Sequence, residues 1–321
     1  MKAIVYRQFG SPEVLHCEEV EEPAPRKGEV LLRVRAVGLN PLDWKLMKGE
    51  PRFLRLIMGL NKPKRPGVDV AGEVEAVGPD VTQFKPGDAI FGSCRGALAE
   101  YVCAPASALT IKPENLSYEQ AASVPVAAWT ALQGLRDKGR IQRGSRVLIN
   151  GAAGGVGTFA VQIAKSFGAE VTGVCSTKNL DRVRSIGADR VIDYTRHDPS
   201  EPDVPYDLIL ECVGNFSFAQ VRRMLTPRGT GVMVGARPDV SLATILGGML
   251  RILLWAPFMK QKIRTFIAKR SQNDLNRIAG LLQSGQITPV IDRCYGFDQV
   301  QEALRYLAAG HARGKVVVRV P

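Results

Sequence analysis

The sequence has few of the residues that build metal sites or disulfide scaffolds. It contains three histidines among 321 residues, and none of them pairs with a cysteine at the spacing of metal ligands. Its six cysteines are scattered, and no two of them form a CxxC pair: Cys17, Cys94, Cys103, Cys175, Cys212 and Cys294. This pattern argues against a zinc ribbon and against a disulfide scaffold, and it indicates a reducing compartment.

The sequence also shows little sign of a secreted or membrane-spanning protein. Residues 1–6 run directly into an expected strand without a signal-peptide pattern, so we expect a cytoplasmic protein. The most apolar stretch, Ile245 to Phe258, contains Arg251 and Pro257 and is too short to span a bilayer. No repeat or low-complexity segment occurs, and no aromatic-rich strand motif indicates a nucleic-acid partner.

Basic residues outnumber acidic ones, which gives a formal net charge of +12. Such a charge attracts anionic membranes, nucleic acids or anionic ligands, but the basic residues are spread along the chain, and we favour a basic soluble surface. Residues 245–270 are the exception, because an apolar run there is followed by several Lys and Arg residues. This stretch predicts a basic amphipathic helix in peripheral contact with a membrane, a cover for the substrate cleft, or a subunit contact.

A short apolar strand, a glycine-rich turn and a helix follow one another between residues 146 and 165. The turn is Gly-Ala-Ala-Gly-Gly-Val-Gly at 151–157. Glycines permit a tight turn and a close approach to a pyrophosphate, and the N-terminus of the helix offers free N–H groups to phosphates. We therefore expect Ala153, Gly154, Gly155 and Val156 to bind a dinucleotide. The alternative is a tight strand-to-helix turn without a ligand.

The two halves of the chain predict different architectures. Residues 1 to about 123 contain many short β-runs separated by Gly and Pro turns, which is typical of a small barrel-like β domain. From Arg146 onward, strands alternate with helices, and this spacing predicts a doubly wound parallel sheet of the α/β class.

The residues after the second strand of this parallel sheet indicate the type of cofactor. NAD sites usually place Asp or Glu there for the ribose hydroxyls, whereas this chain has Cys-Ser-Thr-Lys-Asn at 175–179. Because Ser and Lys bind and neutralise a ribose phosphate, we predict NADPH, bound by Ser176 and Lys178. Tyr194, which ends the next strand, is expected to meet the same phosphate. The alternative is that these residues only form a loop and a helix cap.

A second polar group follows the expected strand at 30–37. Asn40, Asp43 and Lys45 surround Pro41, which is able to open a short helix, and they are candidates for catalytic residues near a strand end. From the local sequence alone, we favour the alternative that Asn40 and Asp43 cap this helix.

Several segments together resemble the medium-chain dehydrogenase/reductase superfamily, specifically its zinc-free branch of quinone oxidoreductase-like proteins. The resemblance covers essentially the whole chain. The segments that carry it are Ala36–Asp43, Pro66–Gly72, Ala152–Gly157, Gly187–Asp189, Val191–Tyr194 and Gly310–Lys315. They are specific to the branch but not to a substrate.

The resemblance implies two domains and no zinc site. A GroES-like, β-rich catalytic domain would comprise residues 1–123 plus 288–321, and a Rossmann NADP-binding domain would comprise residues 124–287. Zinc-dependent members have a Cys at the position of Asn40, a His-Glu pair at Val68-Asp69 and a four-cysteine lobe. This chain has none of these, so we expect no metal.

The resemblance also implies positions for the cofactor, which would lie between the two domains. The pyrophosphate would meet Gly154, Gly155 and Val156, and the ribose phosphate would meet Ser176, Lys178 and Tyr194. The nicotinamide end would lie near Asn40, Thr130, Val213, Gly235 and Arg237.

The resemblance further suggests contacts at the C-terminus and between subunits. His311, Ala312 and Arg313 would form a terminal cofactor-contacting segment, unless His311 is simply a surface residue after a helix. A homodimer would form through the last dinucleotide-domain strand, near Gly231 to Gly235.

Together these observations predict an NADPH-dependent, zinc-independent oxidoreductase. Without a metal, the acceptor must itself be electrophilic or be polarised by hydrogen bonds, which fits a quinone or an α,β-unsaturated carbonyl compound. Asn40, Asp43, Lys45 and Trp129 are the candidates for residues at the substrate, and solvent is the candidate proton source. The alternatives are an NAD(P)-dependent alcohol or aldehyde dehydrogenase and a non-catalytic NADPH-binding protein.

Overall fold

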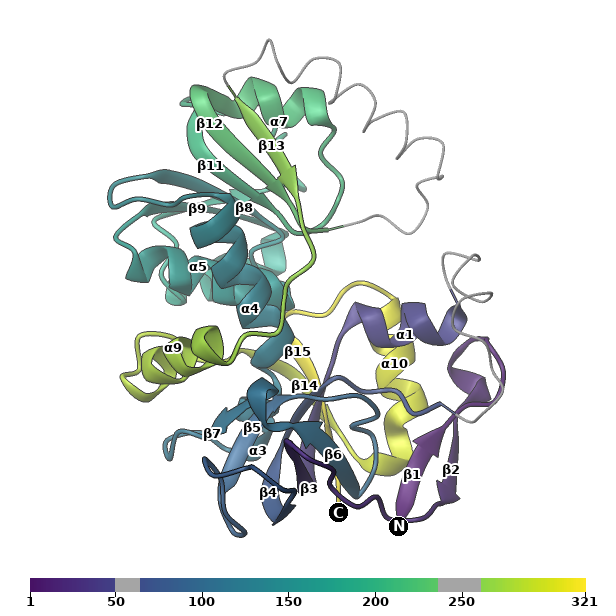
Figure 1. The fold of residues 1–321 in the computed structure, drawn as a ribbon. Coiled ribbons are helices and arrows are strands. Elements are labelled where there is room, and N and C mark those ends of the chain that lie inside the picture. The colour runs from purple at the N-terminus through teal and green to yellow at the C-terminus, as the bar shows by residue number, and fades with distance from the viewer. Residues whose placement is uncertain (50–63, 236–260) are drawn as a thin grey trace. The chain divides into compact units, whose positions relative to one another are not determined.

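The computed structural model describes residues 1–49, 64–235 and 261–321. The chain forms two compact units, one of Met1–Ala127 with Arg270–Pro321 and the other of Ala128–Lys269 (Figure 1). Helix α4 (Pro125–Gln133) carries the chain from the first unit into the second. The first predicted domain boundary, 123/124, lies a few residues from the observed one. The second, 287/288, is corrected to 269/270.

The first unit is built on a seven-stranded sheet with the order β14-β15-β3-β4-β5-β7, in which β6 also pairs with β3. Its pairs are antiparallel except β14–β15, and a separate hairpin joins β1 to β2. The strands are β1 (Lys2–Val5), β2 (His16–Glu19), β3 (Glu29–Leu39), β4 (Asp69–Val77), β5 (Ala89–Ser93), β6 (Tyr101–Pro105), β7 (Leu109–Ile111), β14 (Ile291–Tyr295) and β15 (Lys315–Arg319). The predicted β-rich domain is confirmed.

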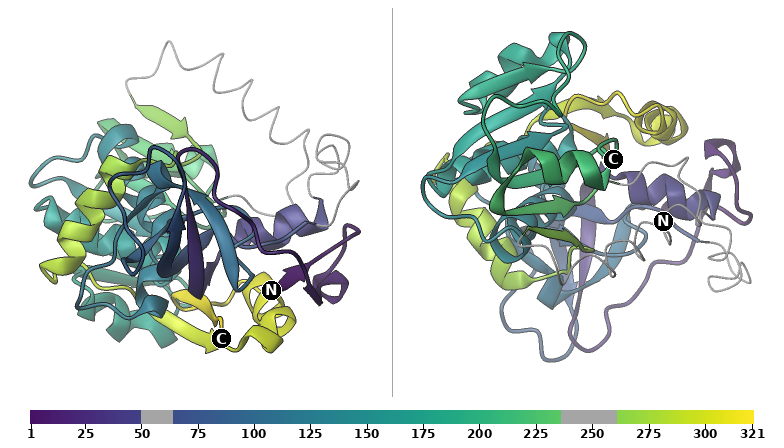
Figure 2. Two further views of the ribbon diagram at one scale, coloured as in Figure 1. Left: turned by 60° about the horizontal axis from the view of Figure 1, so that its bottom comes forward. Right: turned by 90° about the horizontal axis from the view of Figure 1, so that it is seen from above.

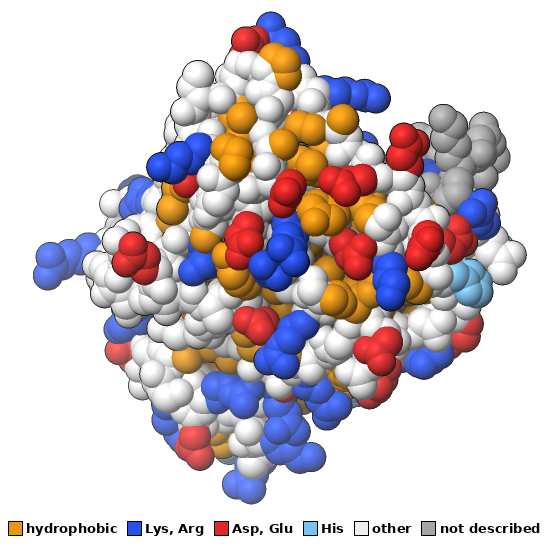
Figure 3. Space-filling model, turned by 90° about the horizontal axis from the view of Figure 1, so that it is seen from below, with side chains coloured by type: hydrophobic (Ala, Val, Ile, Leu, Met, Phe, Trp, Pro, Cys, Tyr) orange, Lys and Arg blue, Asp and Glu red, His pale blue; other side chains and the backbone are white. Residues whose placement is uncertain are grey.

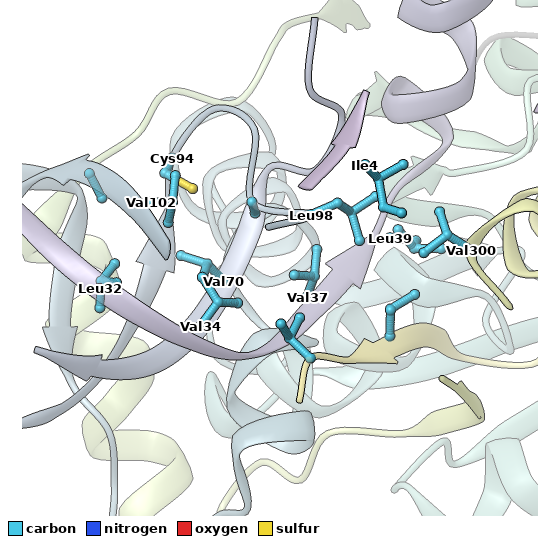
Figure 4. Close-up of a cluster of buried hydrophobic side chains, with 14 of the residues drawn as sticks. Ile4, Leu32, Val34, Val37, Leu39, Val70, Cys94, Leu98, Val102 and Val300 are labelled. Atoms are coloured by element: carbon cyan, nitrogen blue, oxygen red, sulfur yellow. The ribbon is translucent and has the colours of Figure 1, made fainter. Parts of the chain in front are cut away.

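The core of this unit lies along β3. Leu32, Val34 and Ala36 are buried, and Arg33 between them is exposed, because side chains alternate between the two faces of a strand. Figure 4 shows Leu32, Val34 and Val37 among side chains from strands far apart in the sequence. The N-terminus and the C-terminus both lie in this unit (Figures 1 and 2).

The described residues of the first unit include the helices α1 (Pro41–Lys48), α3 (Tyr118–Ala122), α9 (Gln272–Gln283) and α10 (Val300–Ala308). Helix α9 explains the corrected boundary. Thr110 Oγ1 of β7 donates a hydrogen bond to Asn276 Oδ1 at 2.6 Å, and Asn115 Nδ2 donates one to the Leu282 carbonyl at 3.0 Å. These contacts place residues 270–287 with the β-rich unit, although a helix there resembles the preceding α/β pattern.

The second unit is a six-stranded, fully parallel sheet with the order β10-β9-β8-β11-β12-β13. The strands are β8 (Arg146–Asn150), β9 (Glu170–Cys175), β10 (Arg190–Asp193), β11 (Tyr206–Glu211), β12 (Leu225–Met233) and β13 (Lys262–Thr265). Among the described residues, the helices α5 (Gly155–Ser166), α6 (Leu180–Ser185) and α7 (Phe218–Met224) lie between them in the chain. In chain order, β9 and β10 lie on one side of β8, and β11, β12 and β13 lie on its other side. The predicted doubly wound sheet is therefore confirmed.

The stretch predicted as a basic amphipathic helix is only partly described. Residues 245–260 lie outside the described residues, but Lys262–Thr265 forms strand β13 rather than helix. Among the described residues, β12 pairs with β11 and β13 on its two sides, and β13 lies at the edge of the sheet. In the described part of the chain, no helix is long and apolar enough to cross a bilayer.

Positive charge is mixed with negative charge on the face that Figure 3 shows. Lys and Arg side chains lie there among Asp, Glu and hydrophobic side chains over most of the area. On this face, basic and acidic side chains are therefore interspersed.

Candidate functional site

The glycine-rich turn connects β8 to α5 by a backbone path that side chains would block. Gly151 has a φ of +78°, a region that favours glycine. A Cβ atom on Gly157 would overlap the carbonyl oxygen of Gly151. By contrast, a Cβ on Gly154 would have one neighbour within 4 Å, the Gly151 oxygen at 3.3 Å. The outer side of the turn at Gly154 is therefore open.

The first turn of α5 follows this open side. Gly154 precedes the helix as its N-cap, and Gly155 and Val156 are half-buried in its first turn, whereas the Ala153 side chain is buried. The first amides of any helix lack carbonyl partners within it, and they carry the positive end of the helix dipole. The predicted pyrophosphate residues are thus brought together at one helix N-terminus, and the cradle fits a dinucleotide.

Beside this turn lies a buried polar network that the sequence analysis missed. Glu211, at the end of β11, accepts hydrogen bonds from Asn150 Nδ2 at 2.7 Å and from the amides of Val213 at 2.9 Å and Gly214 at 2.5 Å. Burial raises the pKa of Glu211. Because β8 and β11 flank the point where the strand order reverses, the network shapes the loop at the usual ligand crevice. A carboxylate ending the apolar run Leu-Ile-Leu was the available sequence signal.

Two residues predicted at the nicotinamide end lie next to this network. Val213 is 45% exposed, and a Cβ on Gly151 would lie 2.7 Å from its Cγ2 atom. The Gly235 amide donates to the Glu211 carbonyl at 3.0 Å, and a Cβ on Gly235 would overlap Cys212. Thr130 and Trp129 lie nearly buried on α4. Arg237 lies outside the described residues.

The predicted ribose-phosphate residues come from two adjacent strand ends. Asp193 of β10 pairs in register with Cys175 of β9, and the Tyr194 amide donates to the Cys175 carbonyl at 3.1 Å. Ser176 and Lys178 follow β9 directly, and both Lys178 and Tyr194 are exposed. The structure therefore brings these two loops side by side at the carboxyl end of the sheet.

A carboxylate also lies at the corner formed by these two loops, but its oxygens already accept hydrogen bonds from the protein. Asp193 Oδ2 accepts a hydrogen bond from Thr177 Oγ1 at 2.6 Å, and Oδ1 accepts from the Thr195 amide at 3.0 Å and from Thr195 Oγ1 at 2.7 Å. The Thr177 hydrogen bond, with those of Thr195, lowers the pKa of Asp193. Because both of its oxygens accept hydrogen bonds from Thr177 and Thr195, Asp193 is poorly available to ribose hydroxyls.

In the first unit, Asn40 belongs to a buried cluster rather than to an open surface. Its Nδ2 donates to Asp69 Oδ2 at 2.9 Å, and its Oδ1 accepts from Lys315 Nζ at 2.7 Å. Lys315 Nζ also lies 3.3 Å from Asp69 Oδ2, and both charged side chains are nearly inaccessible to solvent. Both ends of the Asn40 amide are therefore used inside the protein. Asp69 and Lys315 were not predicted as site residues.

The other two catalytic candidates have different surroundings. Asp43 is buried in the first turn of α1 and accepts hydrogen bonds from the amides of Asn40 at 2.8 Å and Gly67 at 3.2 Å. This contact agrees with the capping interpretation for Asp43. Burial raises the pKa of Asp43 to about 7. Lys45 is half-buried, with its Nζ 6.0 Å from the ring centroid of Trp44.

The resemblance described above implies that Asn40 and Asp69 stand where zinc-dependent members have a Cys and the Glu of a His-Glu pair. Asn40 and Asp69 offer an amide and one carboxylate, and the Lys315 ammonium lies between them. In the described parts of the chain, no three His, Cys, Asp or Glu side chains are placed to hold a metal ion. The donor set does not fit zinc, which prefers thiolate and imidazole ligands.

The predicted C-terminal segment belongs to the first unit and is anchored by one carboxylate. Asp292 Oδ2 accepts hydrogen bonds from the Arg313 amide at 2.9 Å and from Tyr306 Oη at 2.6 Å. His311 and Arg313 are exposed and Ala312 is half-buried. The segment is thus held at its backbone while its polar side chains face solvent.

Substitution of Lys315 tests the buried cluster. Lys315→Met would leave the Asp69 carboxylate buried and unpaired, and we expect a loss of about 3–5 kcal/mol in the free energy of unfolding. The control is Arg35→Met, which breaks the more exposed Arg35–Glu73 pair and should cost at most about 1 kcal/mol. Urea unfolding measures both, and equal losses would contradict the assigned burial.

The raised pKa of Asp43 predicts a pH dependence of stability. The unfolded carboxyl ionises near pH 3.8 and the folded one near pH 7, so the native state retains the proton over this interval. The free energy of unfolding should therefore fall as the pH rises from about 4 to 7 and then level off. Urea titrations at pH 5 and pH 8 should show a smaller difference for Asp43→Asn than for the unsubstituted protein; an unchanged difference would exclude Asp43 as its source.

Comparison with known proteins agrees with this geometry. Residues 26–114 match the alcohol dehydrogenase GroES-like domain family, and residues 186–318 match the zinc-binding dehydrogenase family. The chain is 33% identical to the chloroplastic quinone-oxidoreductase QR1 of Triphysaria versicolor, over 99% of this chain and 98% of that protein. It is 34% identical to the mitochondrial NAD(P)H oxidoreductase RTN4IP1 of Bos taurus, over 100% and 89% of the two chains.

Two further comparisons extend this picture. The 2-methylene-furan-3-one reductase of Solanum lycopersicum is 33% identical over 99% of this chain and 79% of that protein. The solved structure of the quinone oxidoreductase from Coxiella burnetii superposes with a TM-score of 0.87 at 31% identity, over 100% and 99% of the two chains. The chain therefore belongs to the medium-chain dehydrogenase/reductase family, as a quinone oxidoreductase-like member.

Proposed function

We propose that this protein uses NADPH to reduce a quinone or an α,β-unsaturated carbonyl compound, without a zinc ion. The observation that carries the cofactor preference is the corner formed by the loops after β9 and β10. Lys178 and Tyr194 are exposed there, while the nearby carboxylate of Asp193 is occupied by Thr177 and Thr195. A corner with an exposed cation and a carboxylate whose oxygens are engaged by the protein favours a phosphorylated ribose over a free one.

The second unit supplies the residues that would hold this cofactor. Gly155 and Val156 would offer backbone amides to the pyrophosphate, and Gly154, whose own amide donates to the Gly151 carbonyl at 2.9 Å, would allow its close approach. Ser176, Lys178 and Tyr194 would line the corner for the ribose phosphate. Val213 and Gly235 are proposed to line the nicotinamide end, where Glu211 fixes the loop backbone. The bound cofactor supplies a hydride, and the protein supplies its position and orientation.

The acceptor must react without Lewis-acid activation, since the cluster around Asn40 does not fit a metal. Quinones and enones meet this requirement because their conjugated carbonyl groups accept a hydride directly. Two of the relatives named above are a quinone oxidoreductase and a reductase of an unsaturated furanone, which supports both acceptor classes.

The source of the proton is proposed to be solvent. Asn40 has both amide ends engaged by Asp69 and Lys315, and Asp43 holds two backbone amides in the interior. These contacts favour structural roles for Asn40 and Asp43 over proton transfer.

We further propose a cytoplasmic homodimer, in which β13 rather than the strand near Gly231 provides the sheet edge.

Substitution of Lys178 tests the cofactor preference. Lys178→Ala should raise the Kd for NADPH by about tenfold, which corresponds to one charge-assisted contact of about 1.4 kcal/mol, and leave the Kd for NADH nearly unchanged. Lys262→Ala is the matched control, since Lys262 is exposed on β13 at the opposite edge of the sheet. Fluorescence titration measures both constants, and equal losses for the two cofactors would place the ribose phosphate elsewhere.

The acceptor class is tested by product analysis. The purified protein should oxidise NADPH in the presence of an enone or a para-quinone, and added chelator should not reduce the rate. A saturated carbonyl product would assign enone reduction with hydride transfer to the β-carbon, and a hydroquinone would assign quinone reduction. Tight NADPH binding without turnover of either acceptor would contradict the proposed reaction.

A further inference from the structure

The loops after β9 and β10 are joined by more than strand pairing. Thr177, in the short 3₁₀ turn Thr177–Asn179, donates through Oγ1 to Asp193 Oδ2 at 2.6 Å, and its Oγ1 lies 2.9 Å from Thr195 Oγ1. The amide of Arg196 donates to the Asp193 carbonyl at 3.1 Å and closes a turn. The backbone of the loop after β10 is therefore fixed against the loop that carries Ser176 and Lys178.

Arg196 extends its guanidinium from this turn toward the same carboxylate oxygen. Arg196 Nε lies 3.8 Å from Asp193 Oδ2, the atom that accepts the hydrogen bond from Thr177. The common partner oxygen places the guanidinium beside the turn that follows β9. The Arg196 side chain is 70% exposed, whereas the Asp193 side chain is 7% exposed.

The ion pair between these two residues leaves the guanidinium available. A separation of 3.8 Å is too long for a hydrogen bond, and the guanidinium end of the pair is largely exposed to solvent. Thr177 and Thr195 already satisfy the Asp193 oxygens, so this carboxylate does not depend on Arg196. The five N–H donors of Arg196 are thus held near the corner without a strong partner in Asp193.

We propose that Arg196 is a specificity-determining residue that binds the ribose 2′-phosphate of NADPH together with Lys178. This inference rests on the proposed preference for NADPH. A phosphate dianion offers a guanidinium two parallel hydrogen bonds, which a carboxylate with occupied oxygens does not. Arg196 would move from its loose pair with Asp193 to the phosphate while Asp193 keeps the two loops joined.

The chain contains a matched control on the same strand. Arg190 begins β10, at the end opposite Asp193, and forms an exposed pair with Asp203 at 3.3 Å. Removal of either arginine takes one positive charge from the same unit and breaks one ion pair of an exposed arginine. Arg196 follows β10 at the carboxyl end of the sheet, whereas Arg190 lies at the amino end of the same strand.

The experiment compares cofactor binding by the full chain and by Arg196→Ala, Arg196→Lys and Arg190→Ala. Calorimetric titrations with NADPH, NADH, adenosine 2′,5′-bisphosphate and 5′-AMP give the dissociation constants without any need for turnover. Arg196→Ala should weaken NADPH and the bisphosphate about tenfold and leave NADH and 5′-AMP unchanged. Arg196→Lys should lose less, and Arg190→Ala should match the unsubstituted protein.

The outcomes separate this inference from the proposal on which it rests. If the unsubstituted protein prefers NADPH but Arg196→Ala binds it equally well, the role of Arg196 is overturned and the cofactor preference stands. The same holds if Arg196→Ala weakens NADPH and NADH equally, or if Arg190→Ala loses as much. If the unsubstituted protein binds NADH as tightly as NADPH, the proposed preference fails, and the role of Arg196 fails with it.

Discussion

The contact between Gly157 and the carbonyl oxygen of Gly151 is the constraint on which the cofactor unit depends. No side chain fits at Gly157, so the first turn of α5 packs directly against the turn that leaves β8. This close approach aligns the amides of α5 with the open side at Gly154. It also sets the distance between α5 and the ends of the neighbouring strands, where the polar residues of the proposed cofactor site lie.

Each unit contains a buried carboxylate, and the groups that stabilise it differ between the two units. Asp69 is buried beside the Lys315 ammonium and the Asn40 amide, so its charge has a cationic partner. Glu211 is held instead by the Asn150 amide and two backbone N–H groups. Both arrangements supply the hydrogen bonds that a buried charge needs, and each fixes the end of a strand in place.

Much of the second unit was predictable because its signals are local. Glycine spacing at 151–157 and the alternation of apolar strands with helices are read along the chain, and they led to the confirmed parallel sheet. The same local signals gave wrong predictions where contacts between distant segments determine the structure. Helix α9 resembles one more helix of the α/β pattern, but Asn276 bonds to Thr110 of β7. Residues 262–265 read as basic helix, yet they pair with β12, and this pairing depends on a strand far earlier in the chain.

The sequence by itself determined the family, the two architectures and the glycine turn, since periodicity and backbone freedom are properties of neighbouring residues. The tertiary structure alone decided the surroundings of the polar residues. Asn40 is the N-cap of α1, as the local sequence predicts, but only folding brings its Oδ1 to Lys315 Nζ, 275 residues away. Likewise, the carboxylate of Asp193 is engaged by Thr177, a residue on another strand end. Whether a polar side chain is available to a ligand depends on the partners that folding brings to it, and sequence spacing contains no such information.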